Sequence, residues 1–314
     1  MDDIKVIAMV GRGRSGTTIL DNLLGEMDGF FSGGELHELF RRLEMGFTCG
    51  CGKSVRDCDL WSSVVATTLK DPVLGSIAPS RVVKWQDEVV RLRHLRKPFR
   101  TTVRDNLVWP ALEAYMRVLG RLYQSLGQLT GARVVVDSSK LPAHAAFLSL
   151  VPGIRSHALH VVRDPRAVAY SYQRARNTPD RQLRREGAVE NSMRYVYRNM
   201  AAHEVCRRYP RDRSSLLRYE DFVSCPAMTL QRIAHFLGEE PSTLPVDSNG
   251  VATLRINHTA AGNPSRFRVG SINLKLDDEW IYRQRRFDRV SATLITFPLL
   301  ARYRYRLAPR RGRG

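Results

Sequence analysis

The chain of 314 residues has an ordinary globular composition, 43% hydrophobic and 26% charged, and is long enough for one large α/β domain or two modest ones. Fifty Lys and Arg against 31 Asp and Glu give a formal net charge of +19, which excludes an acidic solvating protein and favours an anionic partner: nucleic acid, a membrane surface or a polyanionic small molecule. Five cysteines do not make a disulfide scaffold, no apolar run approaches the roughly eighteen residues of a membrane span, and residues 1–11 do not read as a secretory signal, so we expect a cytoplasmic protein.

Short apolar runs alternate with helical patterns along the chain. The strand-like runs are residues 5–10, 133–136, 157–162 and 214–218. The helical patterns that follow or separate them are residues 15–25, 105–126 and 226–237. Continuous apolar strands separated by helices are typical of a parallel sheet covered on both faces. We therefore predict a single P-loop-like α/β domain, with a central parallel sheet flanked by helices on both faces.

Two segments depart from this alternation. Residues 45–104 are less regular, and we predict that they form an irregular and helical insertion rather than a separate domain. The domain is expected to span residues 1–300. Residues 301–314 carry six arginines and no acid, and we predict that they form a disordered basic tail.

The first strand runs into a turn rich in glycine and hydroxyl residues. Residues 6–20 read VIAMVGRGRSGTTIL, so a strand, a turn and a helix follow one another directly. Backbone N–H groups and the helix dipole make such a turn an anion site, and glycines allow the close approach that phosphate oxygens need. The alternative is a tight turn with no ligand. The predicted phosphate-binding residues are Gly13, Arg14, Ser15, Gly16, Thr17 and Thr18.

The cation of this turn differs from that of nucleoside triphosphatases. Their pattern, G-x-x-x-x-G-K-[ST], fits from Gly11 to Gly16, but Thr17 stands in the lysine position and the cation is Arg14 instead. The strand RVVVD ends in Asp137, where an ATPase would place a magnesium ligand, yet Ser-Ser-Lys follows it. A P-loop kinase or ATPase is the alternative enzyme, and a basic nucleic-acid-binding protein is the alternative from another class.

Together with a second motif, the turn resembles the sulfotransferases that use 3′-phosphoadenosine-5′-phosphosulfate (PAPS). Residues 14–18, Arg-Ser-Gly-Thr-Thr, resemble the family's 5′-phosphosulfate loop. In HVVRDPRAVAYS, Arg163 at the strand end and Ser171 two helical turns later are similar to the family's 3′-phosphate site, and a guanidinium with a hydroxyl suits a phosphate monoester. The later segment GNPSRFR resembles a basic loop that closes over the nucleotide, which implies that Arg266 or Arg268 helps to hold the phosphates.

The resemblance implies in-line sulfuryl transfer from PAPS to a hydroxyl group, with no metal ion expected. The moving group carries less charge than a γ-phosphoryl group, so cationic side chains can neutralise the leaving phosphate. Arg14 matches the family's loop cation, and Lys140 is a second candidate whose alternative reading is a surface lysine. Glu35 follows a predicted second strand and resembles the family's catalytic glutamate, so we predict that it is the general base rather than a helix-start acid. His37 is the reserve base.

The acceptor is expected to be a hydroxyl of a carbohydrate, a glycolipid or another small molecule or peptide. Residues 41–104 and 174–200 are predicted to build its pocket. No nucleic-acid partner is expected, because no recognisable RNA or DNA module is present. The charge beyond what one nucleotide requires leaves three alternatives open: an anionic acceptor, a peripheral contact with an anionic membrane, or no partner at all. The oligomeric state is not predicted.

Three of the five cysteines lie within ten residues of one another. Cys49, Cys51 and Cys58 form an incomplete zinc set, for which Cys206 or Cys225 would have to supply the fourth ligand. A disulfide from Cys58 to Cys49 or Cys51 is sterically feasible in this glycine-rich loop. We expect a local structural element near the acceptor pocket and favour the disulfide over zinc.

Overall fold

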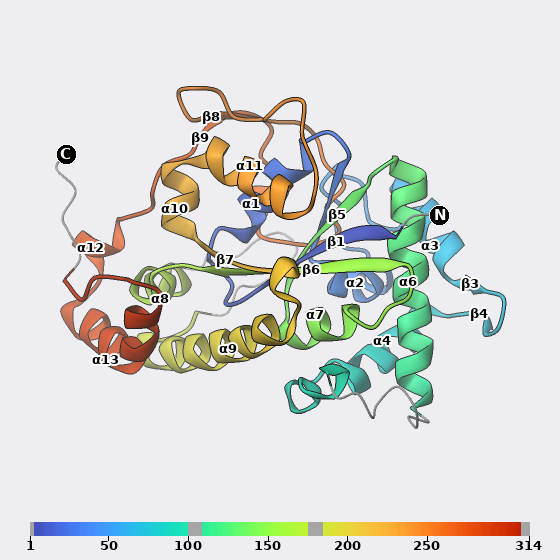
Figure 1. Ribbon diagram of the computed structural model, residues 1–314, viewed down its shortest axis with the longest axis horizontal. Helices are drawn as coiled ribbons and strands as arrows, with labels where there is room; N and C mark the ends of the chain where they lie inside the picture. The colour runs from blue at the N-terminus through green and yellow to red at the C-terminus, as the bar shows by residue number, and fades with distance from the viewer. Residues whose placement is uncertain (1–2, 100–108, 175–184, 309–314) are drawn as a thin grey trace.

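Five parallel strands form the central sheet of the computed structural model, which describes residues 3–99, 109–174 and 185–308 (Figure 1). Their spatial order is β2 (Phe30–Gly34), β5 (Val134–Lys140), β1 (Ile4–Val10), β6 (Ile154–Val162) and β7 (Ser214–Arg218). The four strands located from apolar runs are thus confirmed, together with the second strand expected before Glu35. The central strand β1 pairs with β5 on one side and β6 on the other, so the ends of these three strands lie next to one another.

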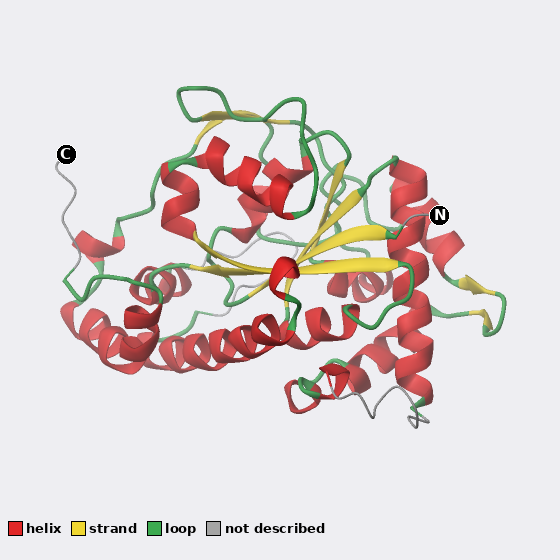
Figure 2. Cartoon of the chain, in the orientation of Figure 1, coloured by secondary structure: helices red, strands yellow, loops and turns green. Residues whose placement is uncertain are grey.

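Both faces of the sheet are buried, as the apolar runs predict. Along β1, Val6 and Val10 point to one core cluster whereas Ile7 and Met9 point to the other, because successive side chains of a strand alternate between faces. One cluster includes side chains of α1 (Thr17–Gly25), α10 (Tyr219–Ser224) and α11 (Pro226–Phe236). The other includes side chains of α2 (Leu39–Met45), α3 (Asp59–Thr68), α4 (Pro79–Val89), α6 (Pro110–Thr130), α7 (Pro142–Leu148) and α9 (Ala188–Arg208). Figure 2 shows the resulting layers of helix, sheet and helix.

A third group of helices lies past the carboxyl ends of β6 and β7, at the left of Figure 1. These are α8 (Pro165–Gln173), α12 (Trp280–Arg283) and α13 (Arg286–Arg302). Between α11 and α12 the chain forms an antiparallel pair, β8 (Val251–Leu254) with β9 (Gly270–Asn273). The loop that joins these two short strands returns to the carboxyl end of β2, where the backbone N–H of Ala260 donates to the carbonyl of Gly33 over 3.0 Å.

The predicted insertion is helical and irregular over its described residues. Besides α3 and α4 it contains the two-residue strands β3 (Lys70–Asp71) and β4 (Gly75–Ser76) and single 3₁₀ turns at Leu92–His94 and Lys97–Phe99. Its buried side chains, among them Trp61, Val64 and Val82, belong to the same core cluster as β1 and α6. The insertion therefore shares the core of the sheet; residues 100–104 lie outside the described part.

The prediction of a disordered tail from residue 301 is wrong as far as residue 308. Tyr303 and Tyr305 are buried in a cluster with Val162 and Tyr195, and the Tyr305 hydroxyl donates to Glu220 Oε2 over 2.7 Å. The buried guanidinium of Arg166 donates to the carbonyls of residues 306 and 307 over 2.7 and 2.6 Å. The arginine count indicated a solvated tail, but the alternating tyrosines supply the apolar surface that anchors it. Residues 309–314 lie outside the described part.

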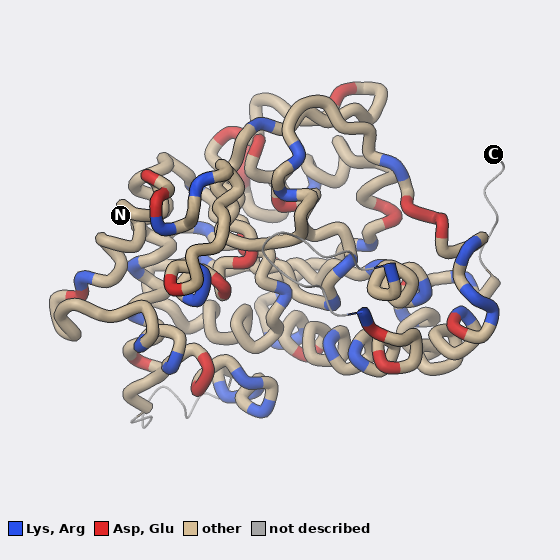
Figure 3. The backbone as a smooth tube through the Cα atoms, turned by 180° about the vertical axis from the view of Figure 1, so that it is seen from behind, with Lys and Arg blue, Asp and Glu red and all other residues tan. Residues whose placement is uncertain are grey.

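Basic residues are spread along the chain rather than gathered in one segment. Figure 3 shows Lys and Arg at many points of the trace, interspersed with Asp and Glu. In the described residues no helix is long and apolar enough to cross a membrane.

Candidate functional site

A cavity of about 900 Å³ opens at the carboxyl ends of β1, β5 and β6. Ligands of open α/β sheets bind outside the carboxyl ends of the strands, at the point where the strand order reverses. Its described lining contains nine Lys and Arg against three Asp and Glu, so it favours an anion. The predicted site residues that line it are Gly13, Arg14, Gly16, Thr17, Thr18, Glu35, Lys140, Arg163, Ser171, Arg266 and Arg268.

The turn after β1 has the tight geometry that its glycines predict. Gly16 has φ 78° and stands directly before the first residue of α1, so the helix N-terminus faces the cavity. A Cβ on Gly16 would lie 2.4 Å from the ring of Tyr219, and a Cβ on Gly13 would lie 2.8 Å from the Tyr172 hydroxyl. Arg14 itself adopts φ 67°, an uncommon conformation for a residue with a side chain.

Ser15 is the one predicted loop residue whose side chain is used elsewhere. It is buried, its hydroxyl donates to the carbonyl of Arg12 over 2.8 Å, and it is absent from the described cavity lining. The hydroxyl therefore closes the turn, whereas Thr17 and Thr18 line the cavity.

Arg163 leaves the end of β6 and reaches the same turn. Its Nη1 donates to the carbonyl of Arg14 over 3.2 Å, and its guanidinium stacks 4.6 Å from the centre of the Tyr219 ring. Its Nη2 forms an ion pair with Asp277 over 3.1 Å. Burial raises the pKa of Asp277, but the positive charge of Arg163 outweighs this and holds it below the usual value. With Ser171 on α8 also lining the cavity, this corner pairs a cation and a hydroxyl as predicted.

Glu35 and Lys140 meet where β2 and β5 end. Lys140 Nζ lies 2.7 Å from Glu35 Oε1 and donates to the carbonyl of Ser138 over 2.7 Å. Burial raises the pKa of Glu35, yet the charge of Lys140, followed by that of His37, prevails and holds the pKa below its ordinary value. The carboxylate is therefore ionised near neutral pH and able to accept a proton, while the ammonium is held at the cavity wall.

The reserve base His37 points elsewhere. Its Nε2 lies 2.9 Å from Glu38 Oε1, and its backbone carbonyl accepts from Gln86 over 3.0 Å. Among the described lining residues the cavity includes Glu35 but not His37. The geometry thus favours the glutamate as the group that can reach a bound molecule.

Asp137, at the position of an ATPase magnesium ligand, is fully buried behind the cavity. The Tyr123 hydroxyl donates to its Oδ2 over 2.6 Å, His144 Nε2 lies 3.0 Å away, and the Ser139 N–H donates to its Oδ1 over 2.9 Å. Burial raises the pKa of Asp137, but the hydrogen bond and charge of His144 dominate and lower it to about 2. This carboxylate holds α6, α7 and β5 together.

The two arginines predicted in the late basic loop differ in their contacts. Arg268 lines the cavity. Arg266 also borders the cavity but is only 2% exposed, and its Nη1 and Nη2 donate to the carbonyls of Thr259 and Thr48 over 2.8 and 2.6 Å. These nitrogens therefore brace the loop instead of presenting themselves to a ligand, and Arg268 is the better candidate for the phosphate contact.

Comparisons with known proteins identify the family and the fold. The sequence profile described as "Sulfotransferase family" matches residues 7–242. The chain belongs to the sulfotransferase family. Its fold is similar to the sulfotransferase domain of the Synechococcus PCC 7002 olefin synthase, at 21% identity over 98% of this chain and 96% of that one, with a TM-score of 0.55. A sulfotransferase domain from the curacin biosynthetic pathway covers 98% and 99% at 18% identity, with a TM-score of 0.50. No significant match is found among curated protein sequences.

The sulfotransferase cavity also contains basic residues that the sequence motifs did not identify. Arg12 forms an ion pair with Glu186 and lies 4.3 Å over the ring of Tyr172. Arg194 contacts the same glutamate over 2.9 Å. Arg12 is a second arginine inside the glycine-rich turn, and this position in the sequence could have identified it as a cavity residue. The remaining cations, Arg42, Arg194 and Lys275, come from separate segments whose proximity only the fold establishes.

Proposed function

We propose that this sulfotransferase moves a sulfuryl group from PAPS to a hydroxyl of a carbohydrate, glycolipid or other small-molecule or peptide acceptor. The observation that carries the proposal is the position of the Glu35–Lys140 pair, which borders the same basic cavity as the Arg14 turn and Arg163. A bisphosphorylated nucleotide needs two separate anion sites, and an acceptor hydroxyl needs a base beside one of them.

The two anion sites are assigned to the ends of two different strands. The turn at residues 13–18, with the N-terminus of α1, is assigned to the 5′-phosphosulfate. Arg163 and Ser171 are assigned to the 3′-phosphate, which would take over from Asp277 as the anion on the guanidinium. Arg268, which lines the cavity from the late loop, is assigned a further contact with the nucleotide.

The chemistry assigned to the chain's own residues is a proton transfer and a charge neutralisation. Glu35 accepts the proton of the acceptor hydroxyl as its oxygen bonds to sulfur and the bond between sulfur and the phosphate oxygen breaks. Lys140 and Arg14 stabilise the charge that develops on the transferred group and on the phosphate that leaves. The lowered pKa of Glu35 means that it needs no prior deprotonation near neutral pH.

Two substitutions separate donor binding from transfer. Arg163→Ala is expected to weaken the binding of adenosine 3′,5′-bisphosphate by about tenfold or more in calorimetry, because a charge-assisted contact contributes roughly 1.5–3 kcal/mol. Glu35→Gln should leave this affinity within about twofold, while single-turnover transfer of label from PAPS falls by at least about a hundredfold.

The acceptor is found by incubating the enzyme with labelled PAPS and fractionated cell extract. Full transfer by Glu35→Gln, or turnover of ATP with magnesium but not of PAPS, would contradict the proposal.

A further inference from the structure

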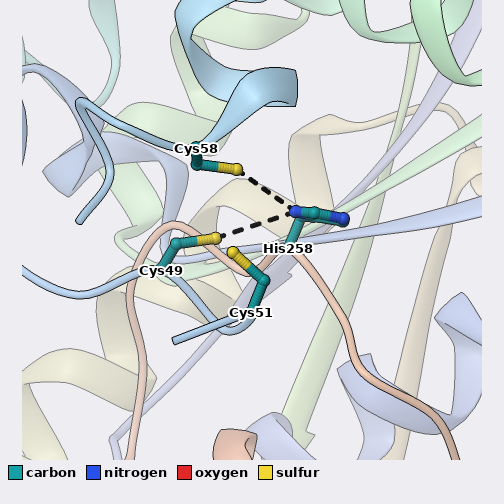
Figure 4. Close-up of side chains that lie close together, drawn as sticks. All are labelled: Cys49, Cys51, Cys58 and His258. Atoms are coloured by element: carbon teal, nitrogen blue, oxygen red, sulfur yellow. Dashed lines mark hydrogen bonds between the residues drawn. The ribbon is translucent and has the colours of Figure 1, made fainter. Parts of the chain in front are cut away.

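Three cysteines and one histidine lie together beside the cavity, outside the residues assigned to the transfer. The ligand atoms of Cys49, Cys51, Cys58 and His258 all lie within 4.8 Å of one another. His258 Nδ1 is 3.2 Å from Cys58 Sγ and 3.9 Å from Cys49 Sγ. Figure 4 shows the four side chains, which come from two segments two hundred residues apart, pointing into one space.

The spacing suits a tetrahedral ion. Zinc bonds of about 2.3 Å to sulfur and 2.0 Å to nitrogen place sulfur and nitrogen ligands about 3.5 Å apart and two sulfur ligands about 3.8 Å apart. The two sulfur–nitrogen distances to His258 lie on either side of that separation. Three thiolates and one imidazole are a frequent donor set for a structural zinc ion.

The backbone around the four side chains is already organised. Thr48 and Ser54 form an antiparallel bridge, and within the turn the N–H of Cys49 donates to the carbonyl of Lys53 over 2.8 Å. The indole of Trp61 donates to the carbonyl of His258 over 2.7 Å. Gly50 allows the two segments to touch, since a Cβ there would lie 2.1 Å from Asn257 Oδ1. The turn and the histidine segment are therefore held together by contacts beyond the four side chains.

We propose that Cys49, Cys51, Cys58 and His258 bind a structural zinc ion that ties the insertion to the late loop of the nucleotide cavity. His258 replaces Cys206 and Cys225 as the fourth ligand considered from the sequence. The disulfide favoured from the sequence is not formed, since all three thiols are free. A disulfide would also use only two of the four converging side chains.

The ion would act on the site through the residues that follow His258. The N–H of Glu35 donates to the carbonyl of Ala261 over 3.0 Å, and Arg266 joins Thr48 to Thr259. Arg266 belongs to the loop that lines the cavity, and Glu35 lines the same cavity. Zinc would thereby fix the position of the glutamate backbone relative to the loop, without contact with the reacting atoms.

The first test is the metal content of the full chain, expressed in zinc-containing medium and purified without chelator or a histidine tag. Inductively coupled plasma mass spectrometry should find about one zinc per chain. Replacement by Co²⁺ should produce the visible bands of a tetrahedral ion with thiolate charge-transfer bands in the near ultraviolet. This result does not depend on whether PAPS is the donor.

Substitutions then assign the ligands. Cys51→Ser and His258→Ala should lower the zinc content at least about tenfold, whereas His258→Cys, which restores a four-thiolate set, should keep it. Cys225→Ser, an exposed cysteine outside the cluster, is the matched control, and Cys206→Ser tests the alternative ligand. Removal of zinc should also increase hydrogen exchange in residues 48–61 and 256–268.

Two outcomes would overturn the proposal. One is a folded chain that carries no zinc, acquires no cobalt bands and has all five thiols reactive after unfolding. The other is an intact mass two hydrogens lower than that of the reduced chain, with peptide mapping that links two of these cysteines. Because both measurements use the unsubstituted protein, failure of a variant to fold does not affect them.

Discussion

At the scale of single residues, the site depends on a few buried charges whose pKa values are set by their neighbours. Lys140 keeps Glu35 ionised despite burial, and it adopts φ 62° to place its side chain at the end of β5. Asp21, on α1, is the opposite case. It accepts from Ser138 and Ser32 over 2.6 and 2.7 Å, yet burial dominates and raises its pKa to about 7.

Removal of the charge of Lys140 should raise the pKa of Glu35. In Lys140→Met burial is no longer opposed by the nearby ammonium, so the acidic limb of the pH profile of kcat/KM moves to higher pH, together with a fall in kcat. Lys140→Arg retains the positive charge and should keep the limb in place. The measurement is transfer from PAPS between pH 4.5 and 9 under saturating and limiting acceptor. An unshifted limb in Lys140→Met would show that Glu35 is not the titrating base.

Asp21 should make the protein less stable as pH rises toward 7. Its pKa is raised in the folded state, so the folded chain holds a proton that the unfolded chain has lost, and this stabilisation declines as pH rises through the folded pKa. Between pH 4 and 7 the Asp21 contribution changes by up to about 1.4 kcal/mol per pH unit. Asp21→Asn should remove that slope in urea unfolding, whereas Asp28→Asn, at the exposed ion pair with Arg133, should not. Parallel profiles for wild type and Asp21→Asn would contradict the assignment.

At the scale of elements, the turn between β1 and α1 packs closely against β6 and Tyr219. Its glycines are required for different reasons. Gly11 is packed against β6, where a Cβ would lie 2.6 Å from the carbonyl of Val161, and Gly16 faces Tyr219. Tyr219 also stacks on Arg163, so one ring contacts both predicted phosphate sites.

Gly16→Ala is expected to disturb donor binding as well as stability. The left-handed φ alone costs about 1–2 kcal/mol, and the clash with Tyr219 adds roughly 1–3 kcal/mol or displaces the ring from Arg163. Gly131→Ala is the matched control, because Gly131 has φ 70° with nothing within 4 Å of its Cβ position. Calorimetry with adenosine 3′,5′-bisphosphate should detect weaker binding in Gly16→Ala only. Equal effects of the two substitutions would exclude the steric explanation.

At the scale of the whole molecule, segments distant in sequence close the fold around the cavity. The chain beyond α13 packs on α8 and α9, where Tyr303 and Tyr305 are buried beside Val162, the last residue of β6. The insertion and the late loop meet at the cysteine cluster. Both contacts connect to strand ends that carry site residues.

Removal of residues 303–314 should therefore destabilise the whole domain. Loss of the two buried tyrosines is expected to lower the free energy of unfolding by at least about 3 kcal/mol, because truncation of one buried aromatic side chain alone typically has that effect. The control removes residues 309–314 only, which takes away three arginines but neither tyrosine. Differential scanning calorimetry should show a clear fall in Tm for the longer deletion alone. Equal Tm values for the two truncations would mean that the tyrosine contacts contribute little.

What the sequence determined by itself was local. Apolar runs located the strands. The glycine turn, Arg163 with Ser171, and Glu35 after a predicted strand indicated residues that the fold brings to one cavity, because each depends on backbone geometry over a few residues or on a strand ending at a common edge. Tertiary structure alone decided the rest. It assigned Arg266 to bracing, anchored Tyr303 and Tyr305 and brought His258 to three cysteines. Each of these contacts joins segments far apart along the chain, and such distances follow from the packing of the whole sheet rather than from any local pattern.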